Sequence, residues 1–139
     1  MDAKRVMNGS HGTLWVDNEL WAETESFDSI VNVDYEPVNM AGKLGSPRKQ
    51  IGWNGTGSLT IHKVNSRVSK MMGENVKKGQ APRLKFVGKL ADPDAWGAER
   101  VALYDVTLDS FTLMKFEQKT NMKIELPFQF SDYDLIDTV

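Results

Sequence analysis

The chain has 139 residues, of which 40% are hydrophobic and 26% charged, a size and composition that suit a single domain with one core. It contains no cysteine, which excludes disulfide bonds, thiol catalysis and zinc sites built on thiolates. No apolar run approaches the roughly 20 residues that span a bilayer. The polar N-terminus has no apolar stretch typical of a secretory signal, so we expect neither a membrane anchor nor a leader.

The formal net charge of −2 is unevenly distributed along the chain. Residues 17–36 carry acidic side chains and no Lys or Arg, residues 37–90 are strongly basic, and residues 91–139 are acidic again. Such blocks indicate a charged partner. Alternatively, the strands bring the blocks together so that they neutralise each other, and the sequence leaves both interpretations open.

The first elements are short. Residues 1–12 are polar and rich in small side chains, which predicts a flexible arm. A strand is expected over residues 13–16, followed by the turn signal Asp17-Asn18, and a second strand begins at Trp21.

A longer strand is predicted between Phe27 and Tyr35, where apolar and polar residues alternate. A period of two with one polar face is typical of a strand with its apolar face buried. Pro37 ends or interrupts this strand, because proline cannot donate to the ladder. The apolar face holds Phe27, Val31, Val33 and Tyr35, and the polar face holds Asp28, Asn32, Asp34 and Glu36.

A loop is predicted over residues 38–50, which show no period and contain the cations Lys43, Arg48 and Lys49. Hairpin loops usually have about two to five residues, so this length favours a functional role over a tolerated surface insertion.

Alternation of apolar and polar residues resumes over residues 51–63, which predicts another strand. Glycines within that strand indicate a bulge or the close approach of another backbone or a large side chain.

One amphipathic helix is expected at about residues 65–78, with Asn65 or Ser66 as its cap. We expect its apolar stripe to pack on the sheet rather than to bind a partner. Further strands are predicted over 84–90, 100–108, 111–114 and 122–130, before an acidic tail. The fold class is therefore mainly β, an antiparallel sandwich or barrel of about seven strands with one flanking α-helix, and residues 1–139 form a single domain.

The sequence contains few candidates for catalysis or metal binding. His11 and His62 have no partners at metal-ligand or triad spacing. Asp92, Asp94 and Glu99 carry oxygen ligands but lack the spacing of an EF-hand, and they fit a turn better. We therefore expect no enzyme activity, no metal and no cofactor.

Two binding functions remain. The basic middle of the chain contains Trp53, Phe86 and Trp96, which suits a nucleic-acid-binding β-barrel with rings for base stacking. The slightly acidic whole chain argues against this alternative. Opposed acidic and basic blocks suit head-to-tail self-assembly, in which one surface meets a different surface of the next copy.

Three stretches go beyond a generic β domain: GTGSLTIHKVNSR (55–67), GAERVALYDVTLDS (97–110) and LPFQFSDYD (126–134). In this order, with a basic helix ending in KKG between the first two, they resemble the tail tube proteins of contractile-tailed phages. The resemblance is greatest to the branch of PBSX-like defective prophages and contractile bacteriocins of Gram-positive bacteria. It extends from about Gly12 to Asp134.

The resemblance implies a structural protein. In that family, β-domains with one flanking helix join edge to edge into hexameric rings, which stack into a hollow tube inside a contractile sheath. It implies as partners the chain itself and the sheath, baseplate and ruler (tape-measure) proteins. The tube conducts DNA without tight binding or punctures a target cell. The implied location is the tail of a virion or phage-like particle, after synthesis in the bacterial cytoplasm.

The resemblance also suggests site residues. In the family a long hairpin loop reaches the neighbouring ring or subunit, and the matching stretch here implies this contact for Lys43, Arg48 and Lys49. A lumen that lets DNA pass should not bind phosphates, which favour Lys and Arg. We therefore expect Asp28 and Asp34, on the polar face of their strand, to face the lumen.

Overall fold

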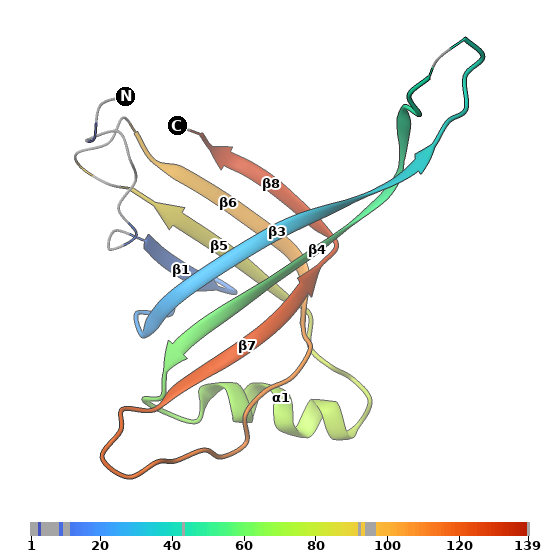
Figure 1. The fold of residues 1–139 in the computed structure, drawn as a ribbon. Helices are drawn as coiled ribbons and strands as arrows, with labels where there is room; N and C mark the ends of the chain where they lie inside the picture. The colour runs from blue at the N-terminus through green and yellow to red at the C-terminus, as the bar shows by residue number, and fades with distance from the viewer. Residues whose placement is uncertain are drawn as a thin grey trace.

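The structure, a computed structural model, describes residues 3, 9, 12–42, 44–91, 93 and 97–138. Strands pair antiparallel in the order β2-β1-β5-β6-β7-β4-β3, and β8 pairs with β6. Figure 1 shows the layer of β3, β4 and β7 crossing the layer of β1, β5, β6 and β8, with α1 at one end. The elements are β1 (Gly12–Val16), β2 (Glu19–Leu20), β3 (Thr24–Pro37), β4 (Arg48–His62), α1 (Arg67–Lys77), β5 (Leu84–Leu90), β6 (Glu99–Leu108), β7 (Lys123–Phe130) and β8 (Asp132–Asp137).

The predicted fold class, an antiparallel β structure with one flanking helix, is confirmed, although the sheet does not close into a barrel. Three predictions about elements were wrong. Residues 111–114 form no strand, and the acidic tail contributes β8. The second strand, expected to begin at Trp21, is Glu19–Leu20 and ends before that residue. The flexible arm expected over residues 1–12 falls almost entirely outside the described residues, and Gly12 already belongs to β1.

The core lies between the two layers and depends on glycines that admit aromatic rings. A Cβ on Gly55 would collide with the ring of Phe130, and a Cβ on Gly57 would collide with the ring of Phe128 and the carbonyl oxygen of Asp28. The glycines therefore mark the close approach of large side chains, one of the two explanations that the sequence allowed. Phe128 in turn stacks on Phe27, with ring centroids 5.8 Å apart.

Phe27 joins the two layers. Its ring makes an edge-to-face contact with Phe86 of β5 at 6.2 Å, and it lies close enough to Gly88 that a Cβ there would be 3.2 Å away. Offset and edge-to-face contacts of this kind are each worth about 0.5–1.5 kcal/mol beyond area burial. These contacts of Phe27 fix the start of β3 to the layer that contains β5.

Strand β6 belongs to both layers because it changes partner along its length. Its first part pairs with β5 and β8, whereas Thr107 and Leu108 pair with β7. The change occurs at Asp105, which has a φ of 56°. Its carboxylate accepts hydrogen bonds from Arg83 Nη1 at 2.9 Å and from Ser131 Oγ at 2.8 Å. The Ser131 hydrogen bond, followed by Arg83, holds the pKa of Asp105 below its ordinary value.

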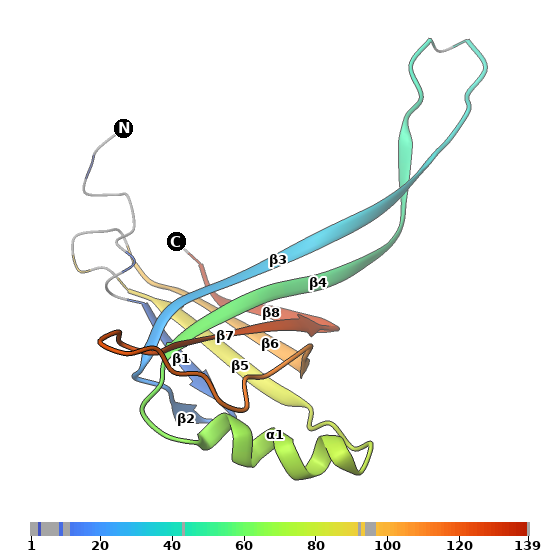
Figure 2. The same cartoon turned by 60° about the horizontal axis from the view of Figure 1, so that its bottom comes forward.

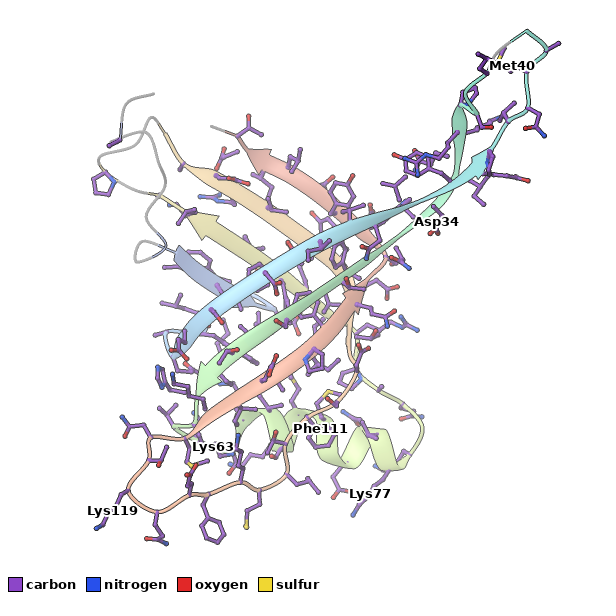
Figure 3. All side chains as sticks on the ribbon, viewed as in Figure 1. Asp34, Met40, Lys63, Lys77, Phe111 and Lys119 are labelled. Atoms are coloured by element: carbon purple, nitrogen blue, oxygen red, sulfur yellow. The ribbon has the colours of Figure 1, made fainter. Side chains whose placement is uncertain are left out.

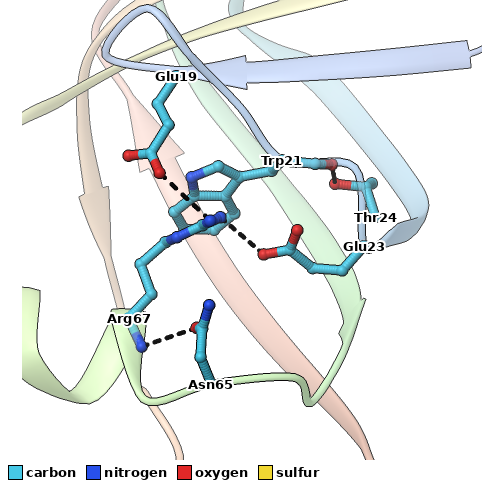
Figure 4. Close-up of polar contacts among 6 residues, drawn as sticks. All are labelled: Glu19, Trp21, Glu23, Thr24, Asn65 and Arg67. Carbon is cyan, nitrogen blue, oxygen red and sulfur yellow. Dashed lines mark hydrogen bonds and ion pairs between the residues drawn. The ribbon is translucent and has the colours of Figure 1, made fainter.

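Helix α1 is fixed to the sheet at its N-terminus (Figure 4). The Arg67 guanidinium lies 2.7 Å from Glu23 Oε1 and 3.2 Å from Glu19 Oε1, and 5.1 Å from the ring centre of the buried Trp21. Asn65 Oδ1 accepts a hydrogen bond from the Arg67 backbone N–H at 3.0 Å, so the Asn65 side chain makes the capping contact and Ser66 makes none.

The helix is shorter than the predicted 65–78. Val68 and Met72 are buried against the sheet, as expected for the apolar stripe. Val64 and Val76, at the two ends of that stripe, are exposed because the helix begins after Val64 and its last turn extends beyond the core.

We predict that Gly57→Ala destabilises the monomer by about 1–3 kcal/mol, because neither the Asp28 carbonyl nor the packed Phe128 ring can yield to a methyl group. Gly73→Ala is the matched control. Gly73 lies within α1, and a Cβ there would meet no atom within 4 Å, so alanine should stabilise by about 0.5–1 kcal/mol. Urea denaturation of both variants measures the difference, and equal stabilities would contradict the packing argument.

Candidate assembly interface

The most distinctive feature of the structure is an arm formed by the outer halves of β3 and β4 (Figure 2). Strand β4 pairs with β7 only up to Gly55, which lies opposite Phe130. Beyond that point β3 and β4 pair only with each other, out to Pro37 opposite Arg48. A two-stranded hairpin is marginally stable in water, so such an arm gains stability from a surface that it contacts.

The loop at the tip of this arm is shorter than the sequence predicted. Strand β4 begins at Arg48, so the loop covers residues 38–47, and the Val38 N–H donates to the Pro47 carbonyl at 2.7 Å. The pairing reaches Arg48 across a bulge: Asp34 lies opposite Gly52 and Tyr35 opposite Gln50, so Ile51 has no opposite residue. That bulge breaks the alternation by which the strand was recognised.

Two of the three predicted contact cations therefore lie in a strand and not in a loop. The Arg48 guanidinium lies 4.1 Å from the centre of the Tyr35 ring, a cation–π contact, and Lys49 lies opposite Glu36. Lys43 lies outside the described residues.

Apolar side chains of the arm are exposed in the single chain. The prediction that the apolar face of residues 27–35 is buried holds only for its start, because Phe27 packs in the core while Val31 and Val33 are each 38% exposed. No described element of the same chain covers the outer part of this face. A contiguous exposed apolar surface of this kind marks an interaction site. Exposed apolar residues of the arm are Val31, Val33, Tyr35, Val38, Met40, Leu44 and Ile51.

The two predicted lumen residues share the opposite, polar face of β3. Asp28 and Asp34 are an even number of residues apart with no bulge between them, and both are exposed. Asp28 Oδ1 accepts hydrogen bonds from the backbone N–H of Ser58 at 2.7 Å and from Ser58 Oγ at 2.9 Å. Asp34 lies further out, at the base of the arm, and Met40 lies at the tip of the arm, as Figure 3 shows.

This polar face continues across the neighbouring strands. Thr56 and Thr60 of β4 lie beside Gln129 and Glu125 of β7, and these four positions alternate with core residues. This face is therefore mostly hydrophilic, with Ile30, which lies between Asp28 and Asn32 and is 51% exposed, as an apolar position on it.

A cleft of about 710 Å³ opens between β3 and the β1–β5 pair, on the side where the sheet does not close. Leu14, Phe27 and Gly88 are among its lining residues. Within the described ranges, no group of three His, Cys, Asp or Glu side chains is placed to hold a metal ion. His62 lies opposite Lys123, and His11, Asp92 and Asp94 lie outside these ranges.

The rings expected for base stacking are not free. Phe86 is fully buried, and Trp53 is partly buried between Phe130 at 6.3 Å and Tyr133 at 5.4 Å. Trp96 lies outside the described residues. The structure thus offers no stacking surface at Trp53 or Phe86. In the same ranges, no helix is both long and apolar enough to cross a bilayer.

The chain is similar to known proteins over nearly its whole length. The family described as Phage tail tube protein matches residues 1–137. Phage-like element PBSX protein XkdM of Bacillus subtilis (strain 168) is 34% identical over 137 residues, which are 97% of this chain and 93% of XkdM.

Solved structures share the fold at lower identity. A chain in the sheath–tube complex of an extracellular contractile injection system, PVC, in its extended state matches with a TM-score of 0.70 and 9% identity, over 96% of this chain and 95% of that one. A chain in the tail of an empty gene transfer agent particle with C6 symmetry matches with a TM-score of 0.63 and 13% identity, over 95% and 100% of the two chains. With the family match and the XkdM similarity, the chain belongs to the phage tail tube protein family, in the PBSX-like branch that its sequence resembles.

Proposed function

We propose that this chain is the subunit of the inner tube of a contractile, phage-like tail. The whole chain forms one tail-tube domain, six copies form a ring, and rings stack into a hollow tube. The family match and the likeness to tube chains of a contractile injection system and of a C6-symmetric tail support this proposal. The observation that carries it is the β3–β4 arm, whose exposed apolar face and unpaired edge need a second copy.

The partners follow from this role. A tube of this kind lies within a sheath and starts from a baseplate, both of which appear in the names of structures that share the fold. We further propose that a ruler protein sets the tube length and that DNA passes through the lumen without tight binding. The subunit acts by geometry and not by catalysis, is made in the bacterial cytoplasm, and ends in the tail of a virion or phage-like particle.

The arm is the proposed contact between rings. Its loop exposes Met40 and Leu44, β4 begins beside it with the cations Arg48 and Lys49, and the loop sequence also contains Lys43. Exposed apolar groups together with cations suit a contact in which the apolar groups give affinity and the charges give orientation.

We predict that the double variant Met40→Ser, Leu44→Ser folds normally but stacks poorly. Met40 is 50% exposed and Leu44 fully exposed, so the free energy of unfolding of the monomer should change by less than about 0.5 kcal/mol. Electron microscopy should show isolated rings in place of tubes. Val76→Ser, at a helix residue that is 44% exposed, is the matched control and should form tubes. Normal tubes from the double variant would show that the tip is not the contact.

The polar face of β3, β4 and β7 is the proposed lumen wall, with Asp28 and Asp34 among its charges. Carboxylates there repel phosphates and keep DNA mobile. Asp34 is the better residue to test, because Asp28 also accepts hydrogen bonds from Ser58.

We predict that tubes of Asp34→Lys still form and retain short DNA present during assembly, whereas tubes of the unmodified chain retain little. Each ring loses six negative charges and gains six positive charges on its inner wall, so retention should decrease steeply as salt rises. Co-sedimentation of DNA with tubes is the measurement. Glu74→Lys, with the same charge change on α1, sets the level of binding outside the lumen. Loss of assembly in Asp34→Lys would place this carboxylate in an interface, and assembly without DNA retention would place it outside the lumen.

A further inference from the structure

One end of the molecule is rich in lysine. It consists of residues 63–78, which include α1, and residues 110–122 of the connection between β6 and β7, and we call it the basic end. Figure 1 shows both parts at the bottom of the molecule, and the turned view in Figure 2 keeps them there. Glu74 and Glu117 are its acidic residues, and Arg67 is paired with Glu23 and Glu19. Its lysines are Lys63, Lys70, Lys77, Lys78, Lys115 and Lys119.

The connection in the basic end is held in place at both of its ends. Phe111 packs against the core, and Ser69 Oγ of α1 donates to the Thr112 carbonyl at 3.4 Å. At the other end, the Lys63 backbone N–H donates to the Met122 carbonyl at 2.9 Å. This surface is therefore formed in the single chain, so a partner that binds there has little chain left to order.

Exposed apolar side chains lie among these lysines. Leu113 is 72% exposed, Met114 81% and Phe116 74%. In the part of the chain that the structure describes, none of the lysines of the basic end makes an ion pair. Apolar groups and unpaired cations on one preformed surface favour a partner that offers apolar groups and carboxylates.

Strand β8 carries these complementary groups. All of its residues are exposed, among them Leu135 at 63% and Ile136 at 47%. Residues 131–139 contain aspartates and no Lys or Arg. Within the described ranges, the edge of β8 that faces away from β6 pairs with no strand. An apolar and acidic strand is thus open to a partner.

The aspartates of β8 share one face of the sheet. Strict alternation would place Asp137 on the other face from Asp134, but a register shift leaves Ile136 without an opposite residue and brings Asp137 back. This face is turned to solvent, because Leu103, which alternates with its β6 positions, belongs to the core. The opposite residues on β6 are Tyr104 for Asp132, Ala102 for Asp134 and Arg100 for Asp137.

The basic end and the end of β8 lie at opposite ends of the molecule. Asp137 pairs with Arg100 near the start of β6, whereas the connection leaves β6 after Leu108, at its other end. Figures 1 and 2 agree, since the C-terminal end of β8 is far from α1 in both views. A head-to-tail contact joins two different surfaces of one chain, and surfaces at opposite ends suit copies that stack along an axis. The placement therefore favours a second copy as the partner.

We propose that the basic end of one copy docks on β8 of a copy in the adjoining ring. The contact centres on residues 110–122, whose exposed apolar side chains pack against Leu135 and Ile136, while Lys115 and Lys119 lie against the aspartates. This inference rests on the proposed tube and gives its rings a second contact besides the arm. An acidic protein outside the tube is the competing occupant of the basic end, and a charge swap distinguishes the two.

Two variants reverse the charge on one side of the contact each. Lys115→Glu, Lys119→Glu changes the basic end, and Asp134→Lys, Asp137→Lys changes β8. All four residues are exposed, and Asp137 gives up only a half-exposed ion pair with Arg100 at 3.5 Å, so both monomers should fold. We expect each variant alone to need a concentration about tenfold higher or more to form tubes, because like charges then face each other across the contact. Sedimentation of tubes measures this concentration.

The variant that combines all four substitutions is the matched control. Its net charge equals that of the unmodified chain, and its two ends are complementary again, so it should form tubes at the concentration of the unmodified chain. An equal mixture of the two separate variants should also form tubes, because the basic end of each then meets an oppositely charged β8 of the other.

An apolar variant gives a second readout that does not depend on charge. Met114→Ser, Phe116→Ser should leave the monomer folded, since both side chains are exposed, but should raise the concentration needed for tubes by about tenfold. Val76→Ser is its control. It changes the last turn of α1, where Lys77 lies apart from Lys119 in Figure 3, and should form tubes normally.

Three results would count against these proposals in different ways. If the unmodified chain forms tubes and the charge variants and the apolar variant form them equally well, the docking is wrong and the tube function stands. If the charge variants assemble poorly and neither their mixture nor the combined variant recovers, the two surfaces do not meet each other, which overturns the docking and favours the acidic outside partner. If the unmodified chain forms neither rings nor tubes, the proposed function itself fails.

Discussion

Strand β3 presents a long row of backbone N–H and C=O groups along its outer edge, and no strand in the described part of the chain pairs with them. An unpaired edge is a hazard for a protein that works as a monomer, because any extended chain can add to it. In this chain the edge continues into an arm with exposed apolar side chains. A second copy removes the hazard, since the pairing that would be uncontrolled elsewhere becomes the contact that builds the ring.

The rest of the fold holds the start of this edge in place. The rings of Phe128 and Phe130 occupy the space that side chains at Gly57 and Gly55 of β4 would need. Because β4 has no side chains at these two positions, the layer of β3, β4 and β7 packs closely on the other layer. Phe27 then fixes the start of β3 to β5, and the contacts of Asp105 hold β6 at its change of layer. Both ends of the proposed lumen sheet are thus anchored in the body, while the arm and the segment after β6 remain available to other copies.

Much of this arrangement could be predicted from the sequence, since local pattern decides most elements. Val68 and Met72 at helical spacing identify α1, and alternating apolar residues identify β4, β5, β6 and β7. Strand β8 was missed because Asp132, Asp134 and Asp137 have low strand propensity, although Tyr133 and Leu135 alternate with them. The loop at the arm was set too long because a bulge at Ile51 interrupts the period.

Two further errors, at Val31 and Val33 and at Leu113, fit the proposed assembly, in which another copy would cover these residues. The apolar face at Val31 and Val33 was expected to be buried, and Leu113 was expected in a strand, yet both are exposed here. A sequence pattern records where a side chain is buried in the working state, but not which copy covers it. The roles of Arg48, Lys49, Asp28 and Asp34 depend on neighbouring copies in the same way and stay predictions.

The central claim is that copies of this chain form hollow, six-membered rings through the β3 edge and stack through the arm. Electron cryomicroscopy of the purified protein at high concentration tests it most directly. We expect rings or tubes with a central channel, six subunits per ring, a continuous sheet around the lumen and arms that reach the adjoining ring. Compact oligomers without a channel, or tubes in which the β3 edge stays unpaired, would contradict it.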